Sequence, residues 1–167
     1  MYRPSPLPAT FALVALLVVL LPVAALAAAA KPQGGPAGEA GALFEEGMSL
    51  LERGDLAAAA EKFEAAVAED GDFAEAHNNL AYALRKQGAE HYDTAKKHYD
   101  TAIELDPELA QAYHYRGILH ALAGDEAAAK ADHAELLELD RDLADELMQV
   151  IASGEEPDGM SGAASWE

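Results

Sequence analysis

The pattern of hydrophobic and polar positions between residues 42 and 152 is typical of α-helices. Alternating runs of β-branched residues, which indicate strands, do not occur in this stretch. Ala, Leu, Glu and Lys, all of which favour the helical conformation, dominate it instead. We therefore predict an all-α fold of six or seven helices.

Two segments that flank this stretch have no apolar period. Residues 28–41, AAAKPQGGPAGEAG, are rich in Gly, Pro and Ala and are predicted to form a flexible linker. Residues 153–167, SGEEPDGMSGAASWE, are polar and rich in Gly, and we predict a disordered acidic tail in which Trp166 is exposed. Neither segment can bury enough apolar surface to offset the entropy cost of ordering it.

The segment before the linker has the pattern of a leader for export. An uncharged apolar run, residues 11–21, follows a short start that carries Arg3. We assign a secretory signal peptide to residues 1–27, with cleavage near residues 27–30. An uncleaved anchor is the alternative, because residues 11–30 carry no charge over about the 20 residues that cross a bilayer. We expect a periplasmic protein, or an inner-membrane anchored one if the segment is retained.

A short motif is duplicated in the second half of the chain: residues 91–95, HYDTA, return seven positions later as residues 98–102. Seven residues make nearly two helical turns, so the two tyrosines share one helical face, and so do the two alanines. Zinc does not fit between the histidines, because they would lie about 10.5 Å apart along the helix and each nitrogen must lie about 2 Å from the metal. A coiled coil is disfavoured because the heptad stops after two copies. We interpret the motif as part of one packing helix.

Three longer units align with one another, at residues 43–71, 77–107 and 113–141. Each has a small residue four positions after its first, a Gly in the middle, then an Ala, and an aromatic residue or His four positions later. In unit order these are Gly47, Ala81 and Gly117; Gly54, Gly88 and Gly124; Ala59, Ala95 and Ala129; and Phe63, Tyr99 and His133. The shared register predicts three helical hairpins, in which the small residues of the first helices face the alanines of the second.

This register resembles the tetratricopeptide repeat family, whose unit has an aromatic, a small residue, a central turn, an alanine, a second aromatic and a closing proline. The second unit ends in Leu105-Asp106-Pro107, as in the family. Gly71 and Arg141 stand where the other two prolines are expected. The resemblance implies an α-solenoid domain over residues 42–152, with helix-turn-helix repeats at about 40–73, 74–109 and 110–143.

A further amphipathic segment follows the third unit. In residues 142–153, DLADELMQVIAS, four apolar side chains lie on one helical face behind Asp142, a favourable N-cap. We predict a capping helix at about residues 142–152 that covers the open end of the stack.

The resemblance also implies a binding face, because the first helices of this family line a concave groove that takes extended peptides or helices. Asn79 matches an asparagine that binds ligand backbone in family members. The basic residues with which some members clamp the acidic tail of a chaperone are replaced by Phe44, Met48, Gln111 and Tyr115, which argues against that ligand. The positions carried over are Phe44, Glu45, Met48, Leu51, Asn78, Asn79, Tyr82, Arg85, Lys86, His114, Tyr115, Ile118 and Leu122. Some of these side chains are equally expected to fill space between helices.

The composition and the absence of known motifs exclude several classes of function. The chain has 30 acidic and 11 basic residues and a net charge of −19, which argues against a nucleic-acid partner. It has no cysteine, which excludes disulfides and thiolate chemistry. No nucleotide-binding loop or nucleophile elbow occurs, and no two histidines are four residues apart. We expect no catalytic residue, no metal and no cofactor, and hence no enzymatic activity.

The sequence therefore predicts a non-enzymatic adaptor or scaffold of the bacterial periplasm or cell envelope. It would bind a peptide or helix of another protein in the groove, where Arg85 and Lys86 attract an acidic side chain of the ligand. Tyr82, Tyr115 and Ile118 would bury the apolar anchors of the same ligand. The alternative is a structural protein that associates with itself or with a membrane complex through its convex face. A membrane is expected as a partner only if the leader is not cleaved.

Overall fold

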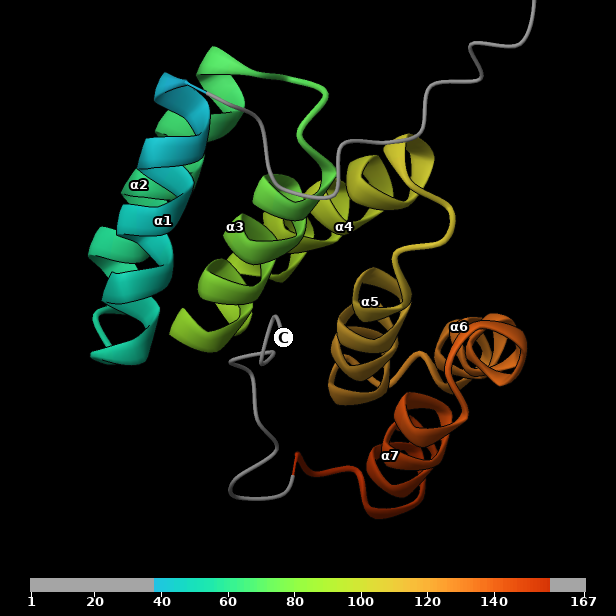
Figure 1. Cartoon of the computed structure of the whole chain (residues 1–167). Helices are drawn as coiled ribbons and strands as arrows, with labels where there is room; N and C mark the ends of the chain where they lie inside the picture. Colours follow the sequence, from blue (N-terminus) through green and yellow to red (C-terminus); the bar gives the residue numbers. More distant parts are fainter. Residues whose placement is uncertain (1–37, 157–167) are drawn as a thin grey trace, which may run out of the picture. The chain divides into compact units, whose positions relative to one another are not determined.

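The computed structural model describes residues 38–156, so the predicted leader, most of the predicted linker and residues 157–167 lie outside it. Within this range the chain forms seven α-helices and one short 3₁₀ helix, and it has no strand (Figure 1). The predicted all-α fold is confirmed. The elements are α1 (Glu39–Glu52), α2 (Leu56–Glu69), α3 (Ala74–Gln87), η1 (Ala89–His91), α4 (Tyr92–Leu105), α5 (Ala110–Leu122), α6 (Glu126–Leu139) and α7 (Arg141–Ser153).

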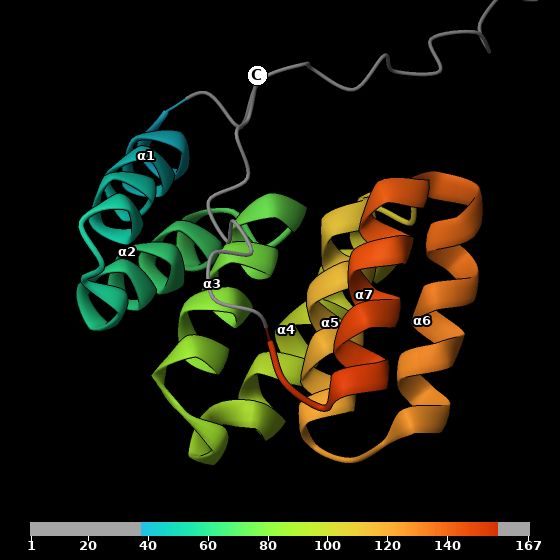
Figure 2. The same cartoon turned by 90° about the horizontal axis from the view of Figure 1, so that it is seen from below.

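The helices pack in chain order as three hairpins. α1 packs on α2, α3 on α4, and α5 on α6, and successive hairpins meet through α2 with α3 and α4 with α5. α7 lies against α5 and α6 at the end of the stack, as Figure 2 shows. This is the predicted architecture of three helix-turn-helix repeats closed by a capping helix.

The turns of the first and third hairpins are built alike. Gly54 and Gly124 adopt φ angles of 76° and 82°, in the left-handed region where glycine has no steric penalty. The next residues, Asp55 and Asp125, cap α2 and α6, because their carboxylates accept hydrogen bonds from amides three residues further on. The glycine predicted to break each of these units is therefore the start of a Gly-Asp turn.

The second hairpin contains a short insertion between its helices. Residues Ala89–His91 form η1, and α4 begins directly after it at Tyr92. The duplicated motif thus lies on α4, apart from its first residue. Ala95, Tyr99 and Ala102 are fully buried on that helix, which confirms the predicted packing face.

Two glycines on the first helices make room for large side chains. A Cβ added to Gly47 of α1 would lie 2.6 Å from the ring of Phe63 on α2. One added to Gly117 of α5 would clash with Leu147 on α7 and lie 3.3 Å from Cβ of Asp132 on α6. The predicted requirement for a small residue holds, but the closest neighbours are bulky side chains rather than the alanines expected from the sequence.

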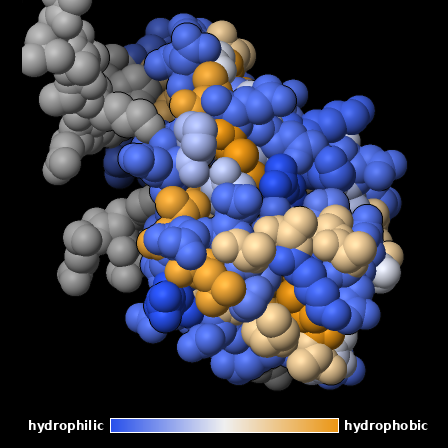
Figure 3. Space-filling model, turned by 90° about the vertical axis from the view of Figure 1, so that its right-hand side faces the viewer, coloured by the Kyte–Doolittle hydropathy of each residue, from blue (hydrophilic) through white to orange (hydrophobic). Residues whose placement is uncertain are grey.

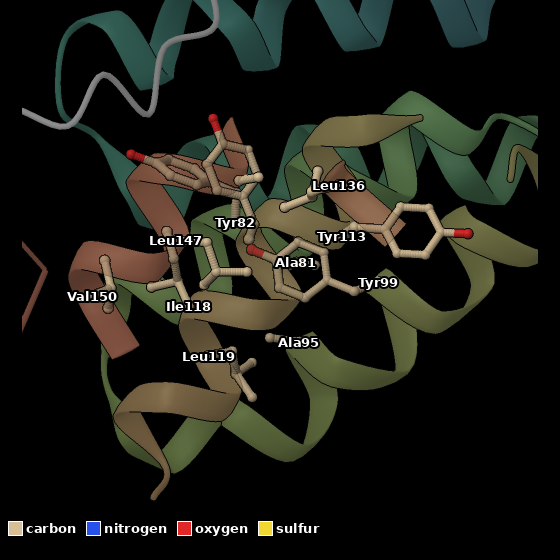
Figure 4. Packing of buried hydrophobic residues seen from close by; sticks show 12 residues of the cluster. Ala81, Tyr82, Ala95, Tyr99, Tyr113, Ile118, Leu119, Leu136, Leu147 and Val150 are labelled. Atoms are coloured by element: carbon tan, nitrogen blue, oxygen red, sulfur yellow. The ribbon is translucent and has the colours of Figure 1, made fainter. Parts of the chain in front are cut away.

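A cluster of twelve buried residues ties the second and third hairpins to α7 (Figure 4). Three further clusters of buried side chains lie around Phe63, Phe73 and Ala102 in the same stack. Aromatic rings supply much of the buried area, because tyrosine and phenylalanine bury more surface than any aliphatic side chain. The members of the cluster in Figure 4 are Ala81, Tyr82, Ala95, Tyr99, Tyr113, Tyr115, Ile118, Leu119, Leu136, Ala144, Leu147 and Val150.

The first helix begins earlier than predicted. α1 starts at Glu39, inside the segment predicted as linker, residues 28–41. The reason is that Ala40 is buried in a cluster with Ala66 and Phe73, so the last residues of that segment have an apolar surface to pack against. Composition alone had suggested that nothing in the segment was buried.

The N-cap predicted for the last helix is wrong. α7 begins at Arg141, and its cap is Asp140, whose Oδ1 accepts hydrogen bonds from the amides of Asp142 and Leu143 at 3.0 and 3.1 Å. Asp140 has the extended backbone that an N-cap requires, with φ −156° and ψ 105°. Asp142 already lies within the first turn of the helix.

Hydrophilic residues predominate on the face shown in Figure 3, and hydrophobic ones form small groups between them. The large hydrophobic side chains exposed among the described residues are Leu137, Leu139 and Met148. No helix within residues 38–156 is both long and apolar enough to cross a bilayer. The leader over residues 1–27 lies outside this part of the chain and stays a prediction.

Candidate functional site

The residues predicted to line a groove all lie on the first helices of the hairpins, α1, α3 and α5. Most of those on α3 and α5 are buried, whereas Lys86 is exposed. By helix they are Phe44, Glu45, Met48 and Leu51 on α1; Asn78, Asn79, Tyr82, Arg85 and Lys86 on α3; and His114, Tyr115, Ile118 and Leu122 on α5. The structure therefore separates them into packing residues and a smaller polar site.

The apolar candidates on α1 pack between helices. The ring centroid of Phe44 lies 5.5 Å from that of Phe63 on α2 and 4.8 Å from that of Phe73. Met48 and Leu51 pack against the cluster around Phe63. All three α1 side chains are half-buried, so each presents only part of its surface to a ligand.

Two adjacent asparagines are buried on α3. Asn79 donates a hydrogen bond from Nδ2 to the carbonyl oxygen of Glu75 at 2.9 Å, one turn earlier in the same helix. Neither polar atom of the Asn78 amide has a hydrogen-bond partner within the described part of the chain. In this conformation the Asn79 amide nitrogen is used inside α3 rather than toward a ligand.

Arg85, in the last turn of α3, is the centre of the polar site. Its guanidinium lies over two tyrosine rings, 5.5 Å from the centroid of Tyr82 and 5.9 Å from that of Tyr115 on α5. The two rings are themselves in contact, with centroids 5.1 Å apart. Arg85 is only 3% exposed, so this cation is held in an aromatic environment where cation–π attraction is strong.

The carboxylate that neutralises Arg85 comes from outside the repeats. Nη1 and Nη2 of Arg85 donate to the two oxygens of Glu156 at 2.8 and 3.3 Å. Lys86 contributes a second, more exposed ion pair, with its Nζ 3.5 Å from Glu156 Oε2. Figure 2 shows the segment after α7, drawn in red, returning toward α3. A paired, two-point contact of this kind is the strongest form of arginine–carboxylate recognition.

The electrostatics of the site keep both partners charged. Burial favours the neutral form of Glu156 and would raise its pKa, but the hydrogen bond and charge of Arg85, with help from Lys86, lower the pKa below its ordinary value. Burial would likewise lower the pKa of Arg85, and the neighbouring Tyr99 and Glu156 outweigh it, so that the pKa rises. Burial also raises the pKa of Tyr115 to about 12. The ion pair therefore persists throughout the neutral range.

His114 is a buried neutral base beside this ion pair. Burial, followed by the charge of Arg85, lowers its pKa to about 4. Its Nε2 lies 3.6 Å from the carboxylate of Glu146 on α7, but at neutral pH the imidazole carries no charge to pair with it. Neither ring nitrogen has a hydrogen-bond partner among residues 38–156.

Glu156 is the one residue of the site that the sequence did not indicate. It lies in the segment predicted as a disordered tail, 71 residues beyond Arg85. The available signals were a basic pair on an otherwise acidic chain and two adjacent glutamates, Glu155 and Glu156. Neither signal says that the two segments meet.

Two further histidines, on α3 and α4, are in contact with each other. Nδ1 of His77 on α3 lies 3.0 Å from Nδ1 of His98 on α4, and the rings are stacked. No group of three or more potential metal ligands occurs within residues 38–156. The chemistry of the polar site itself is the binding of a carboxylate, that of Glu156, at Arg85.

Comparison with protein families agrees with the repeats read from the sequence. Residues 44–90 match the family model described as Tetratricopeptide repeat. No curated protein gives a significant match to the chain.

Several solved structures have the same fold. The second TPR domain of Spaghetti (RPAP3) bound to the HSP90 peptide SRMEEVD is 29% identical, with a TM-score of 0.57, and the alignment covers 60% of this chain and 92% of that one. The second TPR domain of human RPAP3 in complex with the HSP70 peptide SGPTIEEVD is 27% identical, with a TM-score of 0.60 and coverage of 66% and 92%. The Arabidopsis OM64 TPR domain is 19% identical, with a TM-score of 0.63 and coverage of 68% and 93%. With its three hairpins and capping helix, the described part of this chain has the fold of the tetratricopeptide repeat domains, and residues 44–90 match their family model.

Proposed function

We propose that this chain is a non-enzymatic protein-interaction adaptor that binds an acidic segment of a partner protein at the face formed by α1, α3 and α5. The proposal rests on the environment of Arg85. Its guanidinium is a nearly buried cation that lies on two tyrosine rings, and a carboxylate from outside the repeats neutralises it. A site of this construction recognises a carboxylate wherever it comes from.

The surroundings of Arg85 suit a peptide ligand. The planar guanidinium presents two parallel donors to one carboxylate, which fixes the orientation of the acidic side chain. Lys86 is exposed and adds a second positive charge at the rim. Tyrosine and arginine are the side chains that most often carry the binding energy of protein interfaces, and here they lie together. The half-buried Phe44, Met48 and Leu51 offer apolar contact further along the same face.

The solved relatives support the ligand class without identifying the ligand. The peptides in the two RPAP3 complexes both end in Glu-Glu-Val-Asp. In this chain Phe44, Met48, Gln111 and Tyr115 stand where clamp residues of the family are basic, and Arg85 lies elsewhere, in the last turn of α3. We therefore propose an acidic protein segment as the ligand and not the tail of a chaperone.

The proposed setting is the bacterial periplasm or cell envelope. This part of the proposal depends on the predicted leader, residues 1–27, which lies outside the described residues. If the apolar segment is retained, the adaptor is anchored in the inner membrane instead. The proposal requires no cofactor.

Site-specific photo-crosslinking in the cells that make the protein tests the proposal. A photoreactive residue replaces the exposed Lys86 in one variant and the exposed Glu104, on α4, in a control. We expect a partner protein to be captured from position 86 and not from position 104. Equal capture from the two positions, or capture of further copies of this chain alone, contradicts the proposal.

A further inference from the structure

The segment that follows α7 is built to bring one carboxylate back onto α3. α7 ends at Ser153, and Gly154 turns the chain with φ 73°, in the left-handed region that glycine adopts freely. Ser153 Oγ donates to the carbonyl of Glu155 at 2.8 Å and accepts from its amide at 3.2 Å. This closed turn sends residue 156 toward Arg85 and leaves the side chain of Glu155 exposed.

In the resulting ion pair the basic side chain is more deeply buried than in the other lysine and arginine pairs of the described residues. Arg116 with Asp132 comes nearest, with side chains 20% and 4% exposed. Lys130 with Glu126 and Lys62 with Glu46 are pairs of exposed side chains, which contribute little. In the pair of Arg85 and Glu156 the arginine side chain is 1% exposed and the glutamate 16%. Removing the carboxylate would leave a buried charge without a partner, so the site requires an acidic occupant.

The buried surroundings of the pair add to the need for an acidic group beside Arg85. Tyr82 and Tyr115 cover the guanidinium, and Glu156 is the carboxylate that pairs with it among the described residues. The carboxylate of Glu146 lies 3.6 Å from Nε2 of His114. Glu156 is attached through a short turn rather than through the helical stack.

We infer that the site formed by Arg85, Tyr82 and Tyr115 binds a glutamate side chain of a peptide, and that Glu156 is its internal ligand in the free protein. This inference rests on the proposed function and specifies it: the partner supplies a glutamate that replaces Glu156 on Arg85. The Glu-Glu-Pro-Asp stretch at residues 155–158 is then a model of the external ligand.

The internal ligand sets the affinity for an external one. A short tether holds its ligand at an effective concentration of about 1 mM or more, so a free peptide must compete with it. Removing the internal carboxylate should therefore increase the apparent affinity for an added acidic peptide. A change one residue away, at the exposed Glu155, should not.

Fluorescence anisotropy with a labelled peptide tests this. The probe is a synthetic peptide of residues 152–160, ASGEEPDGM, added to the full chain, to Glu156→Gln and to the matched control Glu155→Gln. We expect Glu156→Gln to bind the probe at least about tenfold more tightly than the unchanged chain, in line with the loss of an internal competitor. Glu155→Gln should behave as the unchanged chain does.

A second peptide identifies the group that is recognised. In it the glutamate corresponding to Glu156 is replaced by glutamine, and we expect its binding to Glu156→Gln to fall by about tenfold or more. Equal affinity of the probe for all three proteins, or equal binding of the two peptides, overturns the inference. Melting curves confirm that each variant is folded, and Glu156→Asp, which keeps the charge on a shorter side chain, should give an intermediate affinity.

The outcomes also separate this inference from the proposed function. If the probe binds Glu156→Gln as expected but no partner is captured from position 86, the carboxylate site stands and the adaptor function fails. If a partner is captured from position 86 equally well with and without Glu156→Gln, and the probe binds the unchanged chain and Glu156→Gln equally, the adaptor function stands and the internal ligand is contradicted.

Discussion

Arg85 is a nearly buried cation in a protein whose net charge is −19. Transfer of a guanidinium from water is costly unless a carboxylate and additional polar contacts accompany it. Glu156 provides the carboxylate, and the two tyrosine rings provide the electron-rich faces. A hydrophobic side chain would fill the same space with less desolvation cost, and for this reason we propose that Arg85 serves the recognition of a negative group.

Arg85 should contribute much more to the stability of the domain than its neighbour Lys86. Arg85→Gln removes the buried charge and both hydrogen bonds to Glu156, and we expect it to lower the free energy of unfolding by about 2–4 kcal/mol. Lys86→Gln is the matched control, since that ion pair is exposed at the lysine and should contribute less than about 1 kcal/mol. Urea unfolding measures both. Similar losses for the two variants would mean that Arg85 is not held as described.

His114 should make the stability of the domain depend on pH. Its pKa is about 4 in the folded protein and 6.5 ordinarily, so between these values the unfolded chain binds the extra proton. The contribution of the neutral imidazole to the free energy of unfolding is fully present above pH about 6.5. It is lost as the pH falls toward 4, by about 1.4 kcal/mol per pH unit.

His114→Gln isolates this effect from the carboxylates that titrate in the same range. The variant lacks the titrating group, so its free energy of unfolding should fall less steeply than that of the unchanged chain between pH 6.5 and 4. Unfolding by urea at a series of pH values gives the two slopes. Parallel curves would show that burial does not perturb His114.

Gly117 tests the close contact between α5 and α7. Gly117→Ala places a methyl group against Leu147, and we expect a loss of about 1–3 kcal/mol from overpacking. In the double variant with Leu147→Ala the methyl enters vacated space, so the combined loss should be smaller than the sum of the two single losses. Additive losses in thermal or urea unfolding would show that these residues are not in contact.

For single residues, the sequence predicted the place on a helix better than the surroundings of the side chain. Tyr82, Tyr115 and Ile118 were expected to anchor a partner, and the structure places all three in the core cluster. Their helical positions were right, but burial depends on which neighbouring helices approach, and periodicity does not give that. Glu156 could not be predicted, because its partner is 71 residues away and no apolar pattern marks its segment.

For α4, the sequence alone was enough to predict the buried face of the whole helix. Its duplicated motif places Ala95, Tyr99 and Ala102 on one face, and all three are fully buried. Seven-residue spacing keeps side chains on one side of a helix whatever the tertiary context, so this prediction needed no knowledge of the partner helix. The first residue of α7 could not be predicted from the pattern alone. Asp140 and Asp142 are both good N-caps by residue type, and the backbone angles of Asp140 decide between them.

α7 should behave as a structural cap, as the sequence predicted. Leu147 is fully buried against α5, and Leu147→Ala should lower the free energy of unfolding by about 2–5 kcal/mol. Met148, the next residue, is 38% exposed, and Met148→Ala is expected to change stability by less than about 1 kcal/mol. Thermal unfolding of the two variants compares the faces of the helix. Equal effects would contradict the packing of α7 on the third hairpin.

The net charge of the whole molecule should oppose folding at low ionic strength. An excess of 19 negative charges repels itself more strongly in the compact state. Raising the NaCl concentration from about 0.01 M to about 0.15 M shortens the screening length from about 30 Å to about 8 Å. We expect the melting temperature to rise over this range. Glu138→Lys, which reverses an exposed charge, should reduce the rise, and a melting temperature that falls with salt would contradict the argument.

The stack as a whole could be predicted because its units repeat. One hairpin cannot bury its own apolar face, so three units in a shared register require neighbours in chain order, and the structure has them. The repeat explains the scaffold but does not specify a ligand, since the contacts that decide recognition involve single departures from the pattern. We propose that Arg85 and the segment after α7 are such departures.

The most direct test of the account is the identity of the partner segment that touches Lys86. Mass spectrometry of the peptide crosslinked to a photoreactive group at position 86 locates this segment in the partner sequence. The account predicts a stretch with at least one glutamate that can replace Glu156 on Arg85. A captured segment that is basic, or that has no acidic side chain, would contradict it.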